Sequence, residues 1–168
     1  MLIQTERLLL KEITENDFSA LFNLLTNEDV KKTYLVPDFK TEEDFIKMFR
    51  HLQNLSQKQD SRTAGIFLNE MLIGLFHQVE VNGKSIEVGY AIHPDYQNKG
   101  FATEVLRAGI AYFFEKGFSE VYAGAFKTNL ASIKVMEKAG MKKTKMKASV
   151  NYRGENHPCV YYSVRSTI

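Results

Sequence analysis

One stretch of the chain decides the fold: IEVGYAIHPDYQNKGFA, residues 86–102. Its first part alternates between two sides, as a β-strand does: Ile86, Val88, Tyr90 and Ile92 on one, Glu87, Gly89 and Ala91 on the other. Pro94 ends this strand because proline has no N–H for the ladder. Small and apolar residues then recur at helical spacing: Ala102, Val105, Leu106, Gly109, Ile110 and Phe113. The stretch therefore predicts a strand, a short loop and a long helix.

The loop before this helix, residues 97–102, predicts an anion site. Free N–H groups at a helix N-terminus and the helix dipole both attract negative charge. Gly100 lets a ligand approach the backbone, Ala102 keeps the next position small, and Lys99 adds positive charge. A diphosphate suits such a loop, and an ordinary tight turn that needs a glycine is the alternative. Neither the P-loop pattern nor Gly-x-Gly-x-x-Gly is present.

Three stretches resemble the GNAT superfamily of N-acetyltransferases, and they follow the family's order along nearly the whole chain. The loop matches Gln/Arg-x-x-Gly-x-Gly/Ala, which resembles the family's acetyl-CoA pyrophosphate loop. Residues 129–141 resemble Asn-x-x-Ser-x-x-x-x-Glu-Lys-x-Gly-Phe, with Met141 in place of Phe. Residues 5–10 (TERLLL) resemble the opening of the ribosomal-protein N-terminal, or Rim-type, branch. The resemblance implies an N-acetyltransferase that moves acetyl directly from acetyl-CoA to a primary amine.

The remaining pattern predicts one α/β domain over residues 1–168, with flanking helices on a mixed, mostly antiparallel sheet of about seven strands. Besides residues 86–92, we expect strands at 7–13, 63–68, 71–80, 119–125, 141–150 and 158–165, with 151–157 as the last hairpin loop. Asn82-Gly83 predicts a type I′ turn. The strand–helix–strand crossover predicts one parallel pair, and the resemblance implies that this pair splays apart, as in the GNAT fold.

The resemblance also places the cofactor. We expect the pantetheine arm to pair with the backbone of three strand residues: Tyr90, Ala91 and Ile92. The diphosphate is expected on the loop: Gln97, Asn98, Lys99, Gly100, Phe101 and Ala102. Asn129 is expected to bind the cofactor, to cap the last helix, or to do both.

Two residues are candidates for the chemistry. Glu87 shares a strand face with Gly89 and Ala91, and a partly buried carboxylate there can take the proton of the amine. A solvated charge is the alternative, and His77, His93 and Tyr96 are weaker candidates for the base. Many relatives protonate the thiolate with a tyrosine on the last helix, which this chain lacks between residues 129 and 140. Ser132 resembles the serine proposed for that role in the Rim-type branch; capping or packing is its alternative role.

Composition and charge argue against several other classes of protein. The formal net charge is only +2 without a dense basic stripe, so we expect no nucleic-acid partner. Cys159 is the one cysteine, which excludes an internal disulfide and fits the cytoplasm. No signal sequence, membrane-spanning run or metal-ligand spacing is recognised.

The expected partner is an amine acceptor, either a peptide or protein N-terminus or a small molecule such as a polyamine or an aminoglycoside-like compound. The resemblance alone allows a homodimer. Two alternatives are a non-catalytic acyl-CoA-binding module and a nucleotide-binding domain. A nucleotide-binding domain that used the loop 97–102 would need a Lys-Ser/Thr pair in that loop and an acidic metal-binding pair, and neither is recognised.

Overall fold

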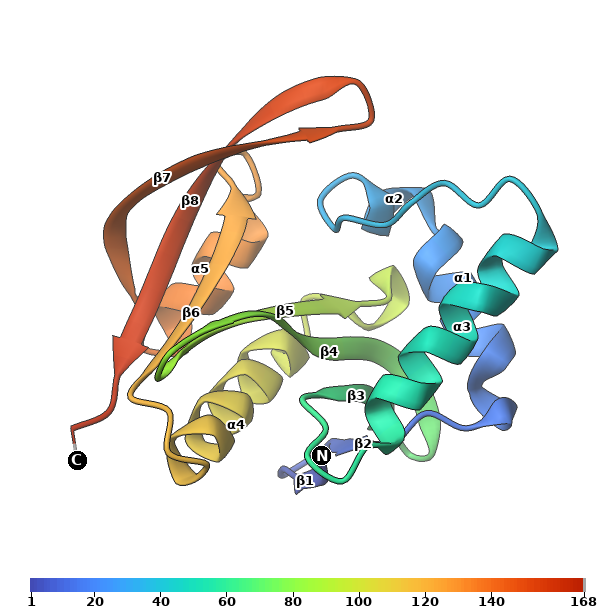
Figure 1. Cartoon of the computed structure of the whole chain (residues 1–168), viewed down its shortest axis with the longest axis horizontal. Coiled ribbons are helices and arrows are strands. Elements are labelled where there is room, and N and C mark those ends of the chain that lie inside the picture. Colours follow the sequence, from blue (N-terminus) through green and yellow to red (C-terminus); the bar gives the residue numbers. More distant parts are fainter. Residues whose placement is uncertain (168) are drawn as a thin grey trace. The chain divides into compact units, whose positions relative to one another are not determined.

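The computed structural model describes residues 1–167, and these form eight strands, five α-helices and two short 3₁₀-helices (Figure 1). The strands are β1 (Ile3–Gln4), β2 (Leu9–Lys11), β3 (Thr63–Leu68), β4 (Met71–Asn82), β5 (Ser85–Ile92), β6 (Glu120–Phe126), β7 (Lys142–Tyr152) and β8 (Glu155–Arg165). The helices are η1 (Glu15–Asp17), α1 (Phe18–Thr26), α2 (Glu28–Lys31), α3 (Glu42–Gln57), η2 (Pro94–Tyr96), α4 (Phe101–Glu115) and α5 (Leu130–Lys138).

The strands form one mixed sheet in the order β1-β2-β3-β4-β5-β6-β8-β7. β5 and β6 pair in parallel, whereas β1–β2, β2–β3, β3–β4, β6–β8 and β7–β8 pair antiparallel. The predicted α/β class, the mostly antiparallel sheet and its one parallel pair are confirmed. The parallel ladder joins Ser85–Glu87 to Glu120–Tyr122. Residues 88–92 of β5 therefore follow the paired part of that strand.

The chain divides into two compact units, so the expectation of a single domain stays a prediction. The first unit is Met1–His77 with Tyr90–Val105, and the second is Gln78–Gly89 with Leu106–Ile168. β4, β5 and α4 each run from one unit into the other.

The first unit packs its helices α1, α2 and α3 on strands β3 and β4. The shared core is apolar and almost fully buried: Ile13, Leu21, Leu24, Leu25, Val30, Val36, Phe45, Phe49, Phe67, Leu72, Leu75 and Ala91. Capping boxes start η1 and α3. Asp17 accepts from the Thr14 backbone N–H at 2.7 Å, and Thr41 accepts from the Asp44 N–H at 3.1 Å.

In the second unit, glycines end both helices. Gly117 has a φ of +88°, and the Phe118 N–H reaches the Phe113 carbonyl at 3.1 Å, with the two rings 5.6 Å apart. Gly140 has a φ of +90°, and the Met141 N–H donates to the Met136 carbonyl at 3.1 Å. Both ends are Schellman motifs, which need a left-handed residue just past the helix.

The structure corrects the predicted sheet in three places. The first strand is shorter than residues 7–13, because Thr5 and Leu8 close a turn that separates β2 from β1, an eighth strand that the sequence analysis missed. The turn after β4 is not type I′, since only Gly83 of Asn82-Gly83 has a positive φ, +59°. The last hairpin has no loop over residues 151–157: β7 and β8 run up to a two-residue turn at Arg153-Gly154, both left-handed.

The backbones of β4 and β5 approach each other closely at Gly74. A Cβ at Gly74 would overlap the Ala91 backbone oxygen and lie 3.0 Å from Ile92 Cδ1. We expect Gly74→Ala to force the two strands apart and to lower the free energy of unfolding by about 2 kcal/mol or more. Urea denaturation measures this. Gly154→Ala is the control, because its Cβ meets open space and only its left-handed backbone costs about 1 kcal/mol. An equal or smaller loss for Gly74→Ala would contradict the packing described.

Candidate active site

The loop between β5 and α4 turns sharply. After Ile92, the His93 N–H still pairs with the Ile73 carbonyl at 2.8 Å, and η2 follows directly. The backbone then passes through two left-handed residues, Asn98 with a φ of +60° and Gly100 with a φ of +82°. Asparagine and glycine are the residues that tolerate this conformation best. The predicted strand, loop and helix are therefore confirmed at the residues expected.

Side chains of the loop hold its own backbone. The Gln97 amide donates to the Ile92 carbonyl at 2.9 Å, so it ties the loop to the end of β5. The Lys99 ammonium donates to the Asp95 carbonyl at 3.0 Å and lies 5.4 Å from the centre of the Tyr96 ring. Gln97 and Lys99 thus stabilise the loop, and the groups that the loop offers an anion are backbone N–H groups.

The start of α4 provides those groups. The first helical hydrogen bond joins the Glu104 N–H to the Gly100 carbonyl at 3.1 Å. The N–H groups of Phe101, Ala102 and Thr103 therefore precede the intrahelical ladder, at the positive end of the helix dipole. Gly100 keeps the approach open, because a Cβ there would meet only the Arg7 Nη2 atom, at 3.4 Å. An anion of phosphate size can bind this helix end.

The strand residues predicted to hold the pantetheine arm lie just before this loop. Tyr90 is half-buried, and Ala91 and Ile92 are buried. All three follow the residues of β5 that take part in the parallel ladder.

Glu87 lies in the second unit within an acidic cluster rich in tyrosine. The half-buried carboxyl has a raised pKa, first because burial disfavours its charge and second because Glu80 adds a like charge. Its ladder partner is Tyr122, whose hydroxyl donates to Glu80 at 3.5 Å and whose pKa is raised to about 12, chiefly by desolvation. The charge of Glu87 also contributes to the raised pKa of Tyr161, whose ring packs over Gly124. A half-buried carboxyl with a raised pKa near tyrosine side chains has properties that suit an acid–base site.

Sequence analysis missed Glu80, Tyr122 and Tyr161 as neighbours of Glu87. A signal for Glu80 was present, since a two-residue loop at residues 83–84 places position 80 opposite position 87. The tyrosines lie on β6 and β8, and only the ladder register brings them to this face.

The first turn of α5 holds Asn129 and Ser132. The Asn129 side-chain oxygen accepts from the Ser132 N–H at 3.1 Å, and the Asn129 N–H donates to the Phe126 carbonyl at 2.8 Å. The predicted cap is confirmed. Whether Asn129 also binds the cofactor and Ser132 protonates the thiolate stay predictions.

Comparison with known proteins identifies the family. A model of the acetyltransferase (GNAT) domain matches residues 7–142. The chain belongs to the GNAT family of acetyltransferases. It is 31% identical over 147 residues to an uncharacterized N-acetyltransferase of Bacillus subtilis, YoaA. The match covers 84% of this chain and 83% of YoaA. The resemblance stated from the motifs is confirmed, and the protein is an N-acetyltransferase.

Two solved structures share the fold. A GNAT-family acetyltransferase from Bacillus anthracis has a TM-score of 0.84 and 26% identity, with 98% of each chain covered. The ribosomal L7/L12 α-N-protein acetyltransferase, solved in complex with coenzyme A, has a TM-score of 0.83 and 19% identity, also with 98% of each chain covered.

The weaker candidates for the base in this GNAT enzyme are bound by neighbours. His77 Nδ1 lies 3.0 Å from the Tyr34 hydroxyl. His93 Nδ1 accepts from the Asp95 N–H at 3.3 Å, so His93 caps η2. The Tyr96 hydroxyl donates to Met71 Sδ at 3.0 Å. These contacts give each of the three a structural role.

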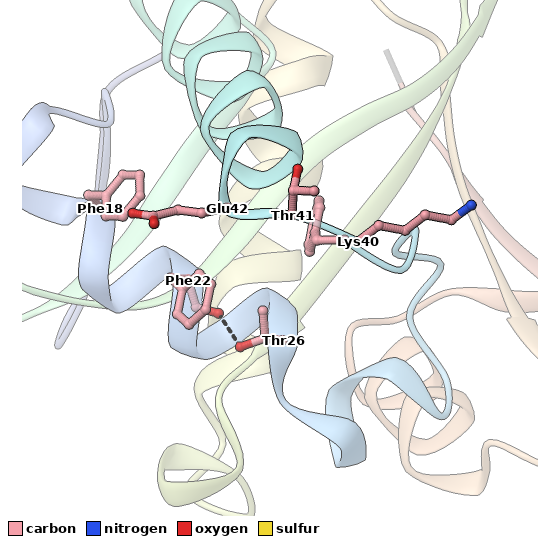
Figure 2. Close-up of a pocket in the computed structure, with 7 residues that line it drawn as sticks. Phe18, Phe22, Thr26, Lys40, Thr41 and Glu42 are labelled. Atoms are coloured by element: carbon pink, nitrogen blue, oxygen red, sulfur yellow. Dashed lines mark hydrogen bonds between the residues drawn. The ribbon is translucent and has the colours of Figure 1, made fainter.

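A surface hollow of about 430 Å³ lies between α1 and the start of α3 in the first unit (Figure 2). Its lining combines aromatic and polar side chains: Phe18, Phe22, Thr26, Phe39, Lys40, Thr41 and Glu42. None of the residues predicted to bind the cofactor or to catalyse lines it.

Among residues 1–167, no group of three His, Cys, Asp or Glu side chains is placed to hold a metal ion. Within the same residues, no helix is both long and apolar enough to cross a bilayer.

Burial of His77 sets its protonation. Desolvation lowers its pKa from 6.5 to about 4, so the ring is neutral at pH 7. We expect an NMR titration to show its midpoint near pH 4. Between pH 6.5 and 4 the unfolded chain binds a proton that the folded chain does not, so this group's contribution to stability is lost as the pH falls through that range. In Tyr34→Phe the midpoint should stay low, because burial rather than the hydrogen bond causes the shift. A wild-type midpoint near 6.5 would contradict the burial.

Proposed function

We propose that the enzyme transfers an acetyl group directly from acetyl-CoA to a primary amine, with the diphosphate of the cofactor on residues 97–102. The observation that carries this proposal is the left-handed Gly100 immediately before the free N–H groups of Phe101, Ala102 and Thr103. Backbone N–H groups at a helix N-terminus are a recurrent phosphate site. The coenzyme A complex of the L7/L12 acetyltransferase, which has this fold, supports the assignment.

The rest of the cofactor follows from the direction of the chain. A pantetheine arm that leaves the diphosphate along β5 meets the backbone of Ile92, Ala91 and Tyr90 in turn. Glu87 precedes Tyr90 by three residues on the same strand, which makes it our candidate for the base. A backbone N–H of Tyr90–Ile92 is our candidate for stabilising the carbonyl oxygen as it becomes negative. Asn129 is our candidate for a further cofactor contact.

The reaction needs a base and an acid. The amine nitrogen attacks the thioester carbon, a C–N bond forms, and the C–S bond breaks as the carbonyl reforms. Glu87 takes the proton that the amine loses, directly or through a water molecule. The departing thiolate takes a proton from the hydroxyl of Ser132, on the first turn of α5, and the hydroxyl regains a proton from solvent as Glu87 releases the one that it took. Ionised Glu87, with Glu80 beside it, also suits a cationic amine before the amine loses its proton.

We favour a peptide or protein N-terminus as the acceptor. The TERLLL opening and the fold shared with the L7/L12 acetyltransferase support it. A small cationic amine such as a polyamine is the second candidate, which the Glu80–Glu87 pair supports. We infer a cytoplasmic enzyme from the lone thiol of Cys159.

Gly100 tests the cofactor site. We expect wild-type protein to bind acetyl-CoA and CoA, but not ATP, in calorimetric titrations. Gly100→Val should weaken acetyl-CoA binding about 100-fold or more, because its side chain fills the approach to the helix N-terminus. Gly117→Val is the matched control: its φ is +88°, so the backbone strain is similar, but it ends α4 far along the chain from the loop. If Gly100→Val bound acetyl-CoA with wild-type affinity, the proposal that the diphosphate binds this loop would be wrong.

Glu87 tests the chemistry. A base works only when ionised, so the wild-type rate should fall as the pH drops through the raised pKa of Glu87. Glu87→Gln should keep acetyl-CoA affinity and lower kcat about 100-fold on the alkaline side of that pKa, with the acidic limb of the pH profile gone. Thiol release with a panel of peptide N-termini and polyamines measures it.

Glu80→Gln is the companion variant. It removes the like charge beside Glu87, so the acidic limb should move to lower pH while the rate at high pH is kept. If Glu87→Gln were fully active, Glu87 would not be the base, and either another group would take the proton or no base would be needed.

A further inference from the structure

Arg7, in the TERLLL opening, contacts the proposed diphosphate loop at Lys99, although the two residues are 92 positions apart in sequence. Its Nη1 donates to the Lys99 carbonyl at 2.9 Å. Its Nε donates to Glu104 Oε2 at 2.7 Å, and its backbone N–H donates to Glu104 Oε1 at 2.9 Å. The guanidinium also lies over the Phe101 ring, 4.6 Å from its centre. One side chain thus contacts residues before, at and after the helix start.

The first of these bonds fixes the direction of a loop N–H group. A trans peptide places its carbonyl and its N–H on opposite sides of the chain. Because Arg7 holds the Lys99 carbonyl, the N–H of Gly100, in the same peptide unit, points away from Arg7. Gly100 is left-handed and a Cβ there would meet only Arg7 Nη2, so its N–H would add a donor for an anion beside the first turn of α4.

The second contact cancels an unfavourable charge. Glu104 is on the first turn of α4, where its carboxylate would repel a diphosphate. Burial alone would raise its pKa, but hydrogen bonds from Thr5 and Arg7 and the charge of Arg7 outweigh burial and lower it, so Glu104 is ionised at neutral pH. Arg7 pairs with this carboxylate at 2.7 Å. The charge of the Glu104 carboxylate is therefore neutralised by an ion pair only while Arg7 is present.

We propose that Arg7 is a positioning residue for the cofactor diphosphate: it orients the Lys99–Gly100 peptide and neutralises Glu104, so that the loop accepts an anion. The proposal rests on the proposed function of the loop. It assigns a physical task to the Arg of the opening motif that is distinct from holding β1 and β2, which Thr5 performs through its contacts with Leu8.

Titration calorimetry with acetyl-CoA tests the proposal. We expect Arg7→Met to weaken binding about 10-fold or more, because the peptide is released and Glu104 is left as an uncompensated negative charge. Arg7→Lys should rescue little of this, since one ammonium cannot serve the carbonyl and the carboxylate in the fixed geometry of the guanidinium. Arg165→Met, which breaks the Arg165–Glu120 pair (3.3 Å) in the second unit, is the matched control and should bind as wild type.

Glu104→Gln separates positioning from simple structural support. It breaks the same ion pair, so a purely structural role predicts weaker binding, as in Arg7→Met. Our proposal predicts unchanged or tighter binding, because Arg7 still holds the Lys99 carbonyl and its charge is now unopposed. The double variant Arg7→Met/Glu104→Gln should bind acetyl-CoA more tightly than Arg7→Met alone.

The outcomes are distinguishable. If the wild type binds no acetyl-CoA, the proposed function itself fails. If the wild type binds and Arg7→Met binds equally well, the role of Arg7 is overturned. Equal losses in Arg7→Met and Glu104→Gln would also overturn it, in favour of a structural latch. Circular dichroism and thermal unfolding check folding, and Glu104→Gln keeps the proposal testable if Arg7→Met does not fold.

Discussion

The structure depends on one backbone constraint: the chain must change from strand to helix between Ile92 and Phe101. Two left-handed residues, Asn98 and Gly100, make that turn. The turn leaves the first N–H groups of α4 outside the helical ladder. The same geometry that connects the two elements therefore creates a donor-rich end. An anion that binds there would satisfy groups that the fold alone leaves to solvent.

β5 links two sites of opposite electrostatic character. Its C-terminal end leads into the N–H groups of the loop, which suit a diphosphate. Its middle carries Glu87, which lies with Glu80 and suits a cationic amine. Under the proposed function, a cofactor arm laid along β5 would join them. In that proposal the first site binds the anionic donor, and the second attracts a cationic amine before it loses its proton.

Features that depend on neighbouring residues in the sequence were predicted best. The loop 97–102 and the Asn129 cap each depend on residues within a few positions, and both formed as expected. Contacts distant in sequence were missed, such as Arg7 with Glu104, 97 positions apart. Tyr161 reaches the face of Glu87 only through the β6–β8 register. The Arg153-Gly154 turn was missed because arginine seldom adopts a left-handed backbone, and the hairpin register imposes it here.

Two half-buried carboxyls differ in whether their surroundings favour the charged form. The pKa of Glu104 is lowered, so its ionisation stabilises the fold above its ordinary value of 4.5, and that contribution is lost as the pH falls through the lowered pKa. The pKa of Glu87 is raised, so the folded state prefers its protonated form, and stability is lost as the pH rises from 4.5 through the raised pKa. Glu104 has partners that stabilise its charge, as a structural group does. Glu87 lies where its charge is disfavoured, beside Glu80, and that cost is expected of a carboxylate that has to accept a proton.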